Sequence, residues 1–191
     1  MEINSKPKLK EIIQIEKNLY YHNDDRNPIE RLELTFIRDT DYYYIQKFLG
    51  LLRKCEWLSY SKRGLHIFRK LRYYLLLRKK NAIGTKLGFS INENVLGEGV
   101  IICHPNVIIN PLTKVGNYCI FHGNNCLGNK GFCDDTRAPI IGNNVEIGFG
   151  AVILGGVTIA DGIKIGANAV VTKSFLQPGI VLAGNPAKRI K

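Results

Sequence analysis

Residues 141–175, IGNNVEIGFGAVILGGVTIADGIKIGANAVVTKSF, contain the repeat that decides the fold of this chain. A branched aliphatic residue recurs at every sixth position, and a small or apolar residue recurs four places after each one. The first series is Ile141, Ile147, Ile153, Ile159, Ile165 and Val171, and the second is Val145, Ala151, Val157, Ile163, Ala169 and Phe175. This spacing fits neither the period of an α-helix, about 3.6 residues, nor that of a β-strand, about two. It is typical of a parallel β-helix built from hexapeptides.

Each hexapeptide is expected to supply one short strand and one corner, so that three of them complete a triangular coil of about eighteen residues. The aliphatic residues then point inward and stack from coil to coil. Gly and Asn are expected at the corners, because corners need backbone angles that bulkier residues resist. The alternative, a set of glycine-rich hairpins, would not keep one unbroken phase of six over this length.

The same phase extends toward the N-terminus, and five further residues are therefore predicted to point inward: Cys103, Ile109, Val115, Phe121 and Leu127. Residues 129–139, NKGFCDDTRAP, carry no aliphatic repeat. They are expected to loop out of one corner, and a loop on a rigid scaffold is a usual place for ligand contacts. The phase resumes at Ile141, and a tail follows the last strand.

The first 83 residues are predicted to form an α-helical segment ahead of a β-helix domain over residues 84–191. Helical spacing of apolar residues, with Pro28 in a first turn and Asp39 as an N-cap, predicts four helices. They are expected over residues 10–21, 28–36, 42–57 and 65–80, and the polar sequence NAIGTK (81–86) is expected to end the helical part. The predicted fold class is therefore mainly β, with the helices as a cap and an assembly surface.

The composition suits one domain with an attached segment, since the chain has 191 residues of which 45% are hydrophobic. It lacks a run of about eighteen apolar residues that would span a membrane, and its N-terminus lacks the apolar core of a signal peptide. Its five cysteines are odd in number and show no disulfide-scaffold pattern. This usage fits a reducing compartment, and a cytoplasmic protein is expected.

The formal net charge of +11 favours an anionic partner, which could be nucleic acid, a membrane surface or a phosphorylated small molecule. The sequence shows no nucleic-acid-binding motif, so a nucleic-acid partner is not expected. The basic excess lies mainly before residue 90. It therefore belongs to the predicted helical segment more than to the β-helix.

The predicted helix over residues 65–80 alternates apolar residues with Arg69, Lys70, Arg72, Arg78, Lys79 and Lys80. One interpretation is a helix that packs on the solenoid while its Arg and Lys stems cover apolar surface. The other is a peripheral helix that lies on a membrane surface. The first interpretation is favoured from the sequence.

Two histidines inside the predicted β-helix are the candidates for chemistry. His104 and His122 lie eighteen residues apart, each directly after a predicted inward position. One full coil would place both imidazoles on the same ridge, about 4.8 Å apart. Histidine suits a general base at neutral pH. His104 is predicted to be that base, and His122 is either a second catalytic group or a residue that orients a neighbour.

Two other kinds of site are weaker. A zinc site would need paired cysteine or histidine spacing, which the sequence lacks, so no metal is expected. Cys133 as a nucleophile is disfavoured because the adjacent acidic residues Asp134 and Asp135 oppose formation of a thiolate.

The motifs of residues 84–191 resemble those of the hexapeptide-repeat acyltransferases, and within them the serine acetyltransferase-like group. The resemblance is carried by KLGFSI (86–91), GEGVIICHPNVIIN (97–110), KVGNYCIFHG (114–123), APIIGNNVEIGFGAVILG (138–155), IKIGANAVVTKSF (163–175) and AGNPAKRI (183–190). It implies a left-handed β-helix, a homotrimer, and acetyl-CoA as co-substrate in the groove between neighbouring solenoids. It also implies that His104 activates the acceptor hydroxyl, without a metal.

The resemblance further implies that acetyl-CoA lies along the later coils. Its pantetheine arm is expected at Phe149, Ala151 and Ala167, where small neighbours let a ligand approach. Lys173, Lys188 and Arg189 are expected to meet its phosphates.

The acceptor is where this sequence departs from the cysteine-synthesis enzymes of the group. Those enzymes carry acidic residues where this chain has Ser90 and Cys103, and a histidine where it has Ala138. An uncharged site favours a sugar or surface-polysaccharide precursor, with predicted contacts at Ser90, Cys103, Asn129, Asp134 and Asp135. The alternatives are serine O-acetylation for cysteine biosynthesis, N-acetylation of an amino sugar, and a non-catalytic solenoid scaffold.

Overall fold

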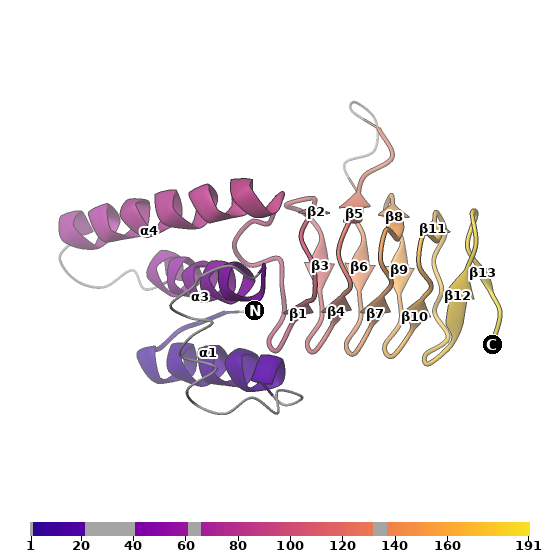
Figure 1. Cartoon of the computed structure of the whole chain (residues 1–191), viewed down its shortest axis with the longest axis horizontal. Helices are drawn as coiled ribbons and strands as arrows, with labels where there is room; N and C mark the ends of the chain where they lie inside the picture. Colours follow the sequence, from indigo (N-terminus) through magenta and orange to yellow (C-terminus); the bar gives the residue numbers. More distant parts are fainter. Residues whose placement is uncertain (1, 22–40, 61–65, 132–136) are drawn as a thin grey trace. The chain divides into compact units, whose positions relative to one another are not determined.

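The computed structural model describes residues 2–21, 41–60, 66–131 and 137–191. They form two compact units, Glu2–Leu87 and Gly88–Lys191, and the boundary follows the predicted one by four residues. The first unit is helical, and the second is built from short strands joined by turns (Figure 1). The predicted helix over residues 28–36 and the N-cap at Asp39 lie outside the described residues.

The helical unit contains α1 (Lys6–Tyr21), α3 (Asp41–Tyr60) and α4 (His66–Leu87). Helix α1 begins after Ser5, whose hydroxyl accepts a hydrogen bond from Lys8 N at 3.3 Å and so caps the helix. The core of the unit comes from apolar residues of α1 and α3 that are at most 1% exposed: Ile12, Ile45, Phe48, Leu49, Leu52 and Cys55.

Helix α4 is longer than predicted, because the polar sequence over residues 81–86 continues the helix instead of ending it. Lys80, Gly84 and Leu87 recur at helical spacing and are all buried. Packing of this face therefore outweighs the weak helix propensity of the residues between them.

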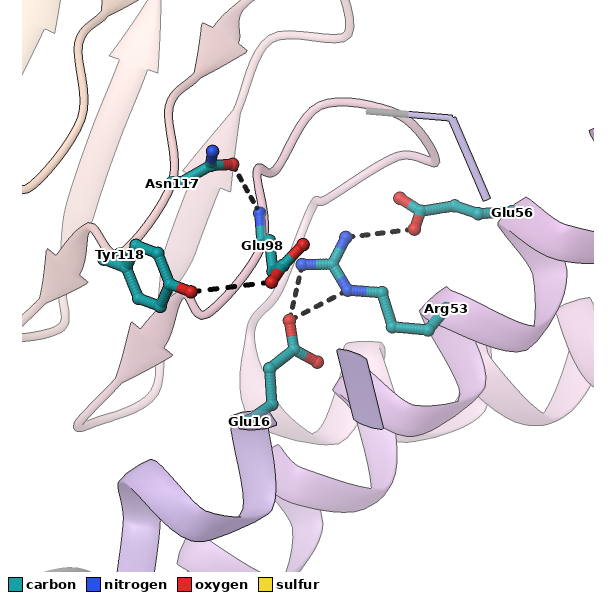
Figure 2. A network of polar contacts seen from close by, with 6 residues as sticks. All are labelled: Glu16, Arg53, Glu56, Glu98, Asn117 and Tyr118. Atoms are coloured by element: carbon teal, nitrogen blue, oxygen red, sulfur yellow. Dashed lines mark hydrogen bonds and ion pairs between the residues drawn. The ribbon is translucent and has the colours of Figure 1, made fainter. Parts of the chain in front are cut away.

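A buried arginine links two helices of this unit. Arg53 of α3 is 0% exposed, and its guanidinium points toward the carboxylates of Glu16 and Glu56 (Figure 2). Its Nη2 lies 2.6 Å from Glu16 Oε1, and its Nη1 lies 3.0 Å from Glu56 Oε2. Burial alone lowers the pKa of Arg53, but the charges and hydrogen bonds of the two glutamates outweigh it and raise that pKa above its ordinary value. The arginine is therefore charged, and it ties α1 to α3.

The β-helix has three faces, each a parallel sheet of strands from successive coils (Figure 1). The six-stranded sheet contains β1 (Ile101–Ile102), β4 (Ile120–Phe121), β7 (Glu146–Ile147), β10 (Lys164–Ile165), β12 (Val181–Ala183) and, antiparallel to β12, β13 (Lys188–Arg189). The four-stranded sheet contains β2 (Val107–Ile109), β5 (Asn125–Gly128), β8 (Val152–Leu154) and β11 (Val170–Val171). The three-stranded sheet contains β3 (Lys114–Val115), β6 (Ile140–Ile141) and β9 (Thr158–Ile159). The predicted fold class, a left-handed β-helix with an N-terminal helical segment, is confirmed.

The predicted inward series is confirmed from Ile109 onward. Both series of residues 141–171 are at most 4% exposed, and Ile147 pairs with Ile165, eighteen residues later. The prediction for Cys103 is wrong, because the first coil is one residue longer. Ile102 pairs with Phe121, nineteen residues later, and Ile102 is the fully buried residue, whereas Cys103 is only half-buried.

Asparagines order the corner that leads into the six-stranded sheet. Asn117 Oδ1 accepts a hydrogen bond from Glu98 N at 2.9 Å (Figure 2), and Asn143 Oδ1 accepts one from Asn117 N at 2.9 Å. In the following coil Asp161 Oδ1 accepts the equivalent hydrogen bond, from Asn143 N at 2.7 Å. The polar side chains that the repeat places at its corners thus bond one coil to the next.

Arg53→Ala should destabilise the helical unit by about 3–5 kcal/mol, because it leaves two buried carboxylates without their cation. The measurement is urea denaturation followed by the helical circular dichroism signal. Lys54→Ala, at an exposed position on the same helix, is the matched control and should change stability by less than about 0.5 kcal/mol. Equal stability of the two variants would contradict a stabilising role for the buried network.

Candidate active site

His104 lies in the corner that joins β1 to β2, and its side chain is exposed. Two backbone hydrogen bonds hold this corner against the next coil. Cys103 N donates to Phe121 O at 2.8 Å, and Asn124 N donates to Pro105 O at 2.9 Å. The imidazole is therefore carried by a turn that is fixed on both sides.

Gly123 occupies the corresponding corner of the next coil and leaves room beside His104. Its φ is +106°, and a Cβ at this position would lie 2.6 Å from His104 Cβ. Phe149 follows one coil later, as Gly150 N donates to Gly123 O at 3.0 Å. The rings of His104 and Phe149 meet edge to face, with their centroids 6.4 Å apart. The glycine thus lets the histidine reach an exposed aromatic ring two coils away.

The same corner continues to Ala167, which is exposed and follows Phe149 through the hydrogen bond from Asn168 N to Phe149 O at 2.9 Å. We call His104, Gly123, Phe149 and Ala167 the His104 ridge. Two predicted acetyl-CoA contacts, Phe149 and Ala167, therefore share this ridge with the predicted base. The ring of Phe149 is 48% exposed, which leaves an apolar surface next to the imidazole.

His122 does not lie on the His104 ridge, so the predicted stacking of the two imidazoles is wrong. The extra residue in the first coil places His122, just after β4, beside Cys103, just after β1, and it places Gly123 beside His104. His122 Nε2 lies 2.9 Å from Glu146 Oε1, and Glu146 Oε2 lies 3.0 Å from Lys164 Nζ. We call these three residues the His122 chain.

The His122 chain sets the charge of this face. A hydrogen bond from Lys164 is the largest cause that lowers the pKa of Glu146 below its ordinary value, and a hydrogen bond from His122 is the next. Burial raises the pKa of the Cys103 thiol, and the negative charge of Glu146 adds to this rise. At neutral pH Glu146 is therefore ionised and Cys103 is a neutral thiol, which rules against a thiolate nucleophile at Cys103.

The predicted acceptor contacts do not form one cluster. Ser90 is exposed and pairs with Ile108 at the edge of the four-stranded sheet, whereas Cys103 directly follows β1 of the six-stranded sheet. Asn129 Nδ2 donates to Gly131 O at 2.8 Å, so this side chain shapes its own loop. Asp134 and Asp135 lie outside the described residues. Within the described part of the chain, no three His, Cys, Asp or Glu side chains are arranged to hold a metal ion.

The remaining predicted acetyl-CoA contacts are distributed unevenly. Ala151 is 0% exposed, its amide donates to Gly148 O, and its carbonyl accepts from Cys126 N and Asn125 Nδ2. The structure therefore leaves no group of Ala151 for a ligand. Lys173 is exposed and lies over the Phe175 ring, at the opposite end of β11 from Ala167.

Lys188 and Arg189 form β13, which pairs with β12. Both are exposed, and Arg189 Nη1 donates to Gln177 Oε1 at 2.7 Å. These two cations and Lys173 thus belong to the last coils but lie on different faces, and their contact with the phosphates of acetyl-CoA stays a prediction.

The predicted excursion leaves the corner after β5 and returns at β6. The residues described at its two ends, Lys130 and Arg137, pack against Gly155 and Gly156. A Cβ at Gly155 would lie 3.0 Å from Lys130 Cε, and one at Gly156 would lie 2.6 Å from Arg137 Cβ. Lys130 Nζ also donates to Thr172 O at 3.0 Å. The two glycines of the sequence LGG (154–156) thus leave the space into which both ends of the loop pack.

Sequence reasoning missed Glu146, Lys164 and Gly123. Glu146 and Lys164 are eighteen residues apart, and their pairing on adjacent strands follows from the repeat itself. The link from His122 to Glu146 was harder to see, because the excursion lengthens that coil to 26 residues. Aligning the inward residues Phe121 and Ile147 would have revealed it.

Lys164→Met should raise the pKa of Glu146, because it removes the largest of the interactions that lower it. The carboxyl 13C shift of glutamate, followed by NMR across acidic pH, measures this change. Lys114→Met, at an exposed lysine of β3, is the control and should leave the pKa of Glu146 unchanged. An unchanged pKa in Lys164→Met would remove the lysine from the His122 chain.

The same interaction predicts how stability depends on pH. The folded-state pKa of Glu146 lies below its unfolded-state value, which is about 4.3 for glutamate. The stability that the carboxylate contributes is therefore complete above that value and is lost as pH falls through the folded-state pKa. Lys164→Met should lose the share of this acid-dependent stability that the lysine contributes and keep the share that His122 contributes.

Comparison with known proteins places the chain in a family. The bacterial transferase hexapeptide family (six repeats) matches residues 138–173. A serine acetyltransferase of Helicobacter pylori is 36% identical over 132 residues, which cover 67% of this chain and 76% of that protein. A serine acetyltransferase of Mycobacterium tuberculosis is 40% identical over 98 residues, covering 50% of this chain and 42% of that protein.

Solved structures share the fold. The serine acetyltransferase of Neisseria gonorrhoeae in complex with serine superposes with a TM-score of 0.70 at 25% identity, covering 98% of this chain and 71% of that one. A serine acetyltransferase in complex with CoA superposes with a TM-score of 0.66 at 22% identity, covering 97% of this chain and 71% of that one. With more than a third of the aligned residues identical over 76% of the Helicobacter protein, this chain belongs to the serine acetyltransferase family of hexapeptide acyltransferases.

Proposed function

We propose that the protein transfers the acetyl group of acetyl-CoA to the hydroxyl of L-serine, with His104 as the general base. The observation that carries the proposal is the match to serine acetyltransferases over 76% of a relative's length. An exposed histidine on a fixed corner, beside an exposed aromatic ring, gives that chemistry a location in this chain.

This proposal replaces the sugar acceptor that the sequence alone favoured. The relatives fit the alternative, serine, better than a surface-polysaccharide precursor, because those described above are named for serine. The uncharged residues Ser90 and Cys103 were the reason for predicting a sugar. The structure offers another source of charge close to Cys103.

That source is the His122 chain. A serine zwitterion needs an anionic partner for its ammonium and a cationic one for its carboxylate. Glu146 is such an anion and Lys164 is such a cation. The His122 chain also comes close to the predicted base, because His122 lies beside Cys103 and Cys103 directly precedes His104. We propose that it contributes the charges that serine recognition requires.

The reaction needs one proton carrier. The neutral His104 imidazole accepts the proton of the acceptor hydroxyl as the oxygen attacks the thioester carbonyl. A tetrahedral oxyanion forms and collapses, the C–S bond breaks, and the thiolate of CoA takes the proton back from His104. The oxyanion would need a hydrogen-bond donor, either a backbone amide or a nearby side chain.

We also propose that the chain acts as a homotrimer, with acetyl-CoA between neighbouring solenoids. An apolar row on the outer face of the four-stranded sheet supports this: Ile108, Cys126, Val152 and Val170 stand in register, and Ile108 is 52% exposed. Light scattering should give three times the mass of one chain, and Ile108→Glu should lower it. A monomer at micromolar concentration would contradict the assembly.

His104→Ala should lower kcat/KM by about a hundred- to ten-thousand-fold, because the hydroxyl loses its base. Its unfolding midpoint should match that of the unsubstituted protein, since the side chain is exposed. His122→Gln keeps a hydrogen-bond donor for Glu146 and should lose less than about tenfold. A larger loss in His122→Gln than in His104→Ala would transfer the role of base to His122.

Release of CoA thiol from acetyl-CoA, measured with a panel of acceptors, tests the substrate. L-serine should give a higher kcat/KM than any sugar alcohol or amino sugar, because only the zwitterion uses both charges of the His122 chain. Glu146→Gln should raise the KM for serine more than it lowers kcat. A kcat/KM for a sugar tenfold above that for L-serine would restore the prediction of a sugar acceptor. The absence of turnover with every acceptor would favour a non-catalytic solenoid scaffold.

A further inference from the structure

Helix α4 has a composition that the acyl-transfer chemistry does not use. None of its 22 residues is Asp or Glu. Its cations are Arg69, Lys70, Arg72, Arg78, Lys79, Lys80 and Lys86. A helix of one charge sign gains nothing from internal ion pairs and repels itself, so an anionic partner would stabilise it.

The outer face of α4 is apolar. Five large side chains are more than half exposed: Ile67 80%, Phe68 72%, Leu71 56%, Tyr74 53% and Leu75 53%. Their spacing of one, three and four residues places them along one side of the helix. Monomeric proteins seldom leave such a contiguous stripe uncovered, and a stripe of this kind marks an interaction surface.

The opposite face fixes how the helix is turned. Arg69 Nε and Nη2 donate to Leu58 O of α3 at 3.2 and 2.5 Å. Lys80 is 3% exposed, and its Nζ lies 6.0 Å from the centroid of the Phe48 ring of α3. The rotation of α4 is therefore set by packing within the helical unit, which keeps the apolar stripe on the outside.

Exposed cations border the stripe on both sides. At about 100° per residue, Lys70 falls on one border of the stripe, and Arg72 and Lys79 fall on the other. Arg78 lies in line with Leu71 and Tyr74 and has a long enough side chain to carry its charge away from the apolar surface. All four are exposed. An apolar stripe bordered by Lys and Arg is the pattern of a helix that lies in a membrane interface.

We propose that α4 docks the protein on an anionic lipid surface, with the stripe in the headgroup region and the bordering cations on lipid phosphates. This goes beyond the proposed function and does not depend on it. A second copy of α4 is a poorer occupant, because a two-fold contact would bring cations against cations. No described helix is long and apolar enough to cross a membrane, so the helix would lie on the surface.

Flotation of the full-length protein with lipid vesicles tests the proposal. Vesicles of equimolar phosphatidylcholine and phosphatidylglycerol should bind at least about tenfold more protein than phosphatidylcholine alone, and added salt should reduce binding. Phe68→Ser/Leu71→Ser and Lys70→Gln/Lys79→Gln should each weaken binding by about tenfold. All four positions are exposed, so circular dichroism should show the fold unchanged.

Matched controls come from other exposed positions. Leu176→Ser, 71% exposed on the β-helix, removes a comparable apolar group, and Lys6→Gln/Lys10→Gln removes two charges from α1. Both should bind within about twofold of the unsubstituted protein. Equal binding to neutral and anionic vesicles would overturn the proposal. The proposal would also fail if the control variants weakened vesicle binding as much as the α4 variants do. It would fail as well if the protein did not bind vesicles but self-associated, and Phe68→Ser/Leu71→Ser abolished that self-association.

Discussion

The stacking of inward residues from coil to coil is the constraint on which the β-helix depends. Phe121 stands under Ile147, and Ile147 stands under Ile165, each pair held by hydrogen bonds between adjacent parallel strands. A change of one residue within a strand would move every following side chain to the other face. The corners are equally confined, since a Cβ at Gly116 would lie 2.4 Å from Gly142 O. Chain length can therefore change only where a corner can bulge outward.

The candidate site is built where the length of a coil does change. The first coil has nineteen residues, and the additional one lies in the corner that carries His104. The coil that follows has 26, and the surplus forms the excursion after β5. These two corners flank the same four-stranded sheet, at opposite ends of its strands. The regular coils supply the rigid support, and the irregular corners supply the reactive and variable groups.

The sequence was informative about the regular part and unreliable at these corners, for the same physical reason. A period of six identifies inward residues as long as no coil is lengthened, and from Ile109 onward the buried residues follow it. One additional residue was enough to misplace Cys103 and to put His122 on the wrong ridge. The partner of His122, Glu146, lies 24 residues further on, beyond the excursion. Pairs of this kind depend on the three-dimensional register of two strands, which local periodicity does not contain.

The helical unit follows different rules, and its charges show it. Inside the unit, Arg53 is balanced by two carboxylates and fully buried. Nineteen of the 27 Lys and Arg residues precede Gly88, yet α4 contains no acidic residue at all. Helix α4 also extends past its predicted end because Gly84 and Leu87 are buried on its packed face. Packing therefore determines the inner face of this helix, whereas nothing in the fold requires an outer face that is both apolar and cationic. Such a face lowers solubility and raises self-repulsion, and binding to an anionic apolar surface would offset both costs.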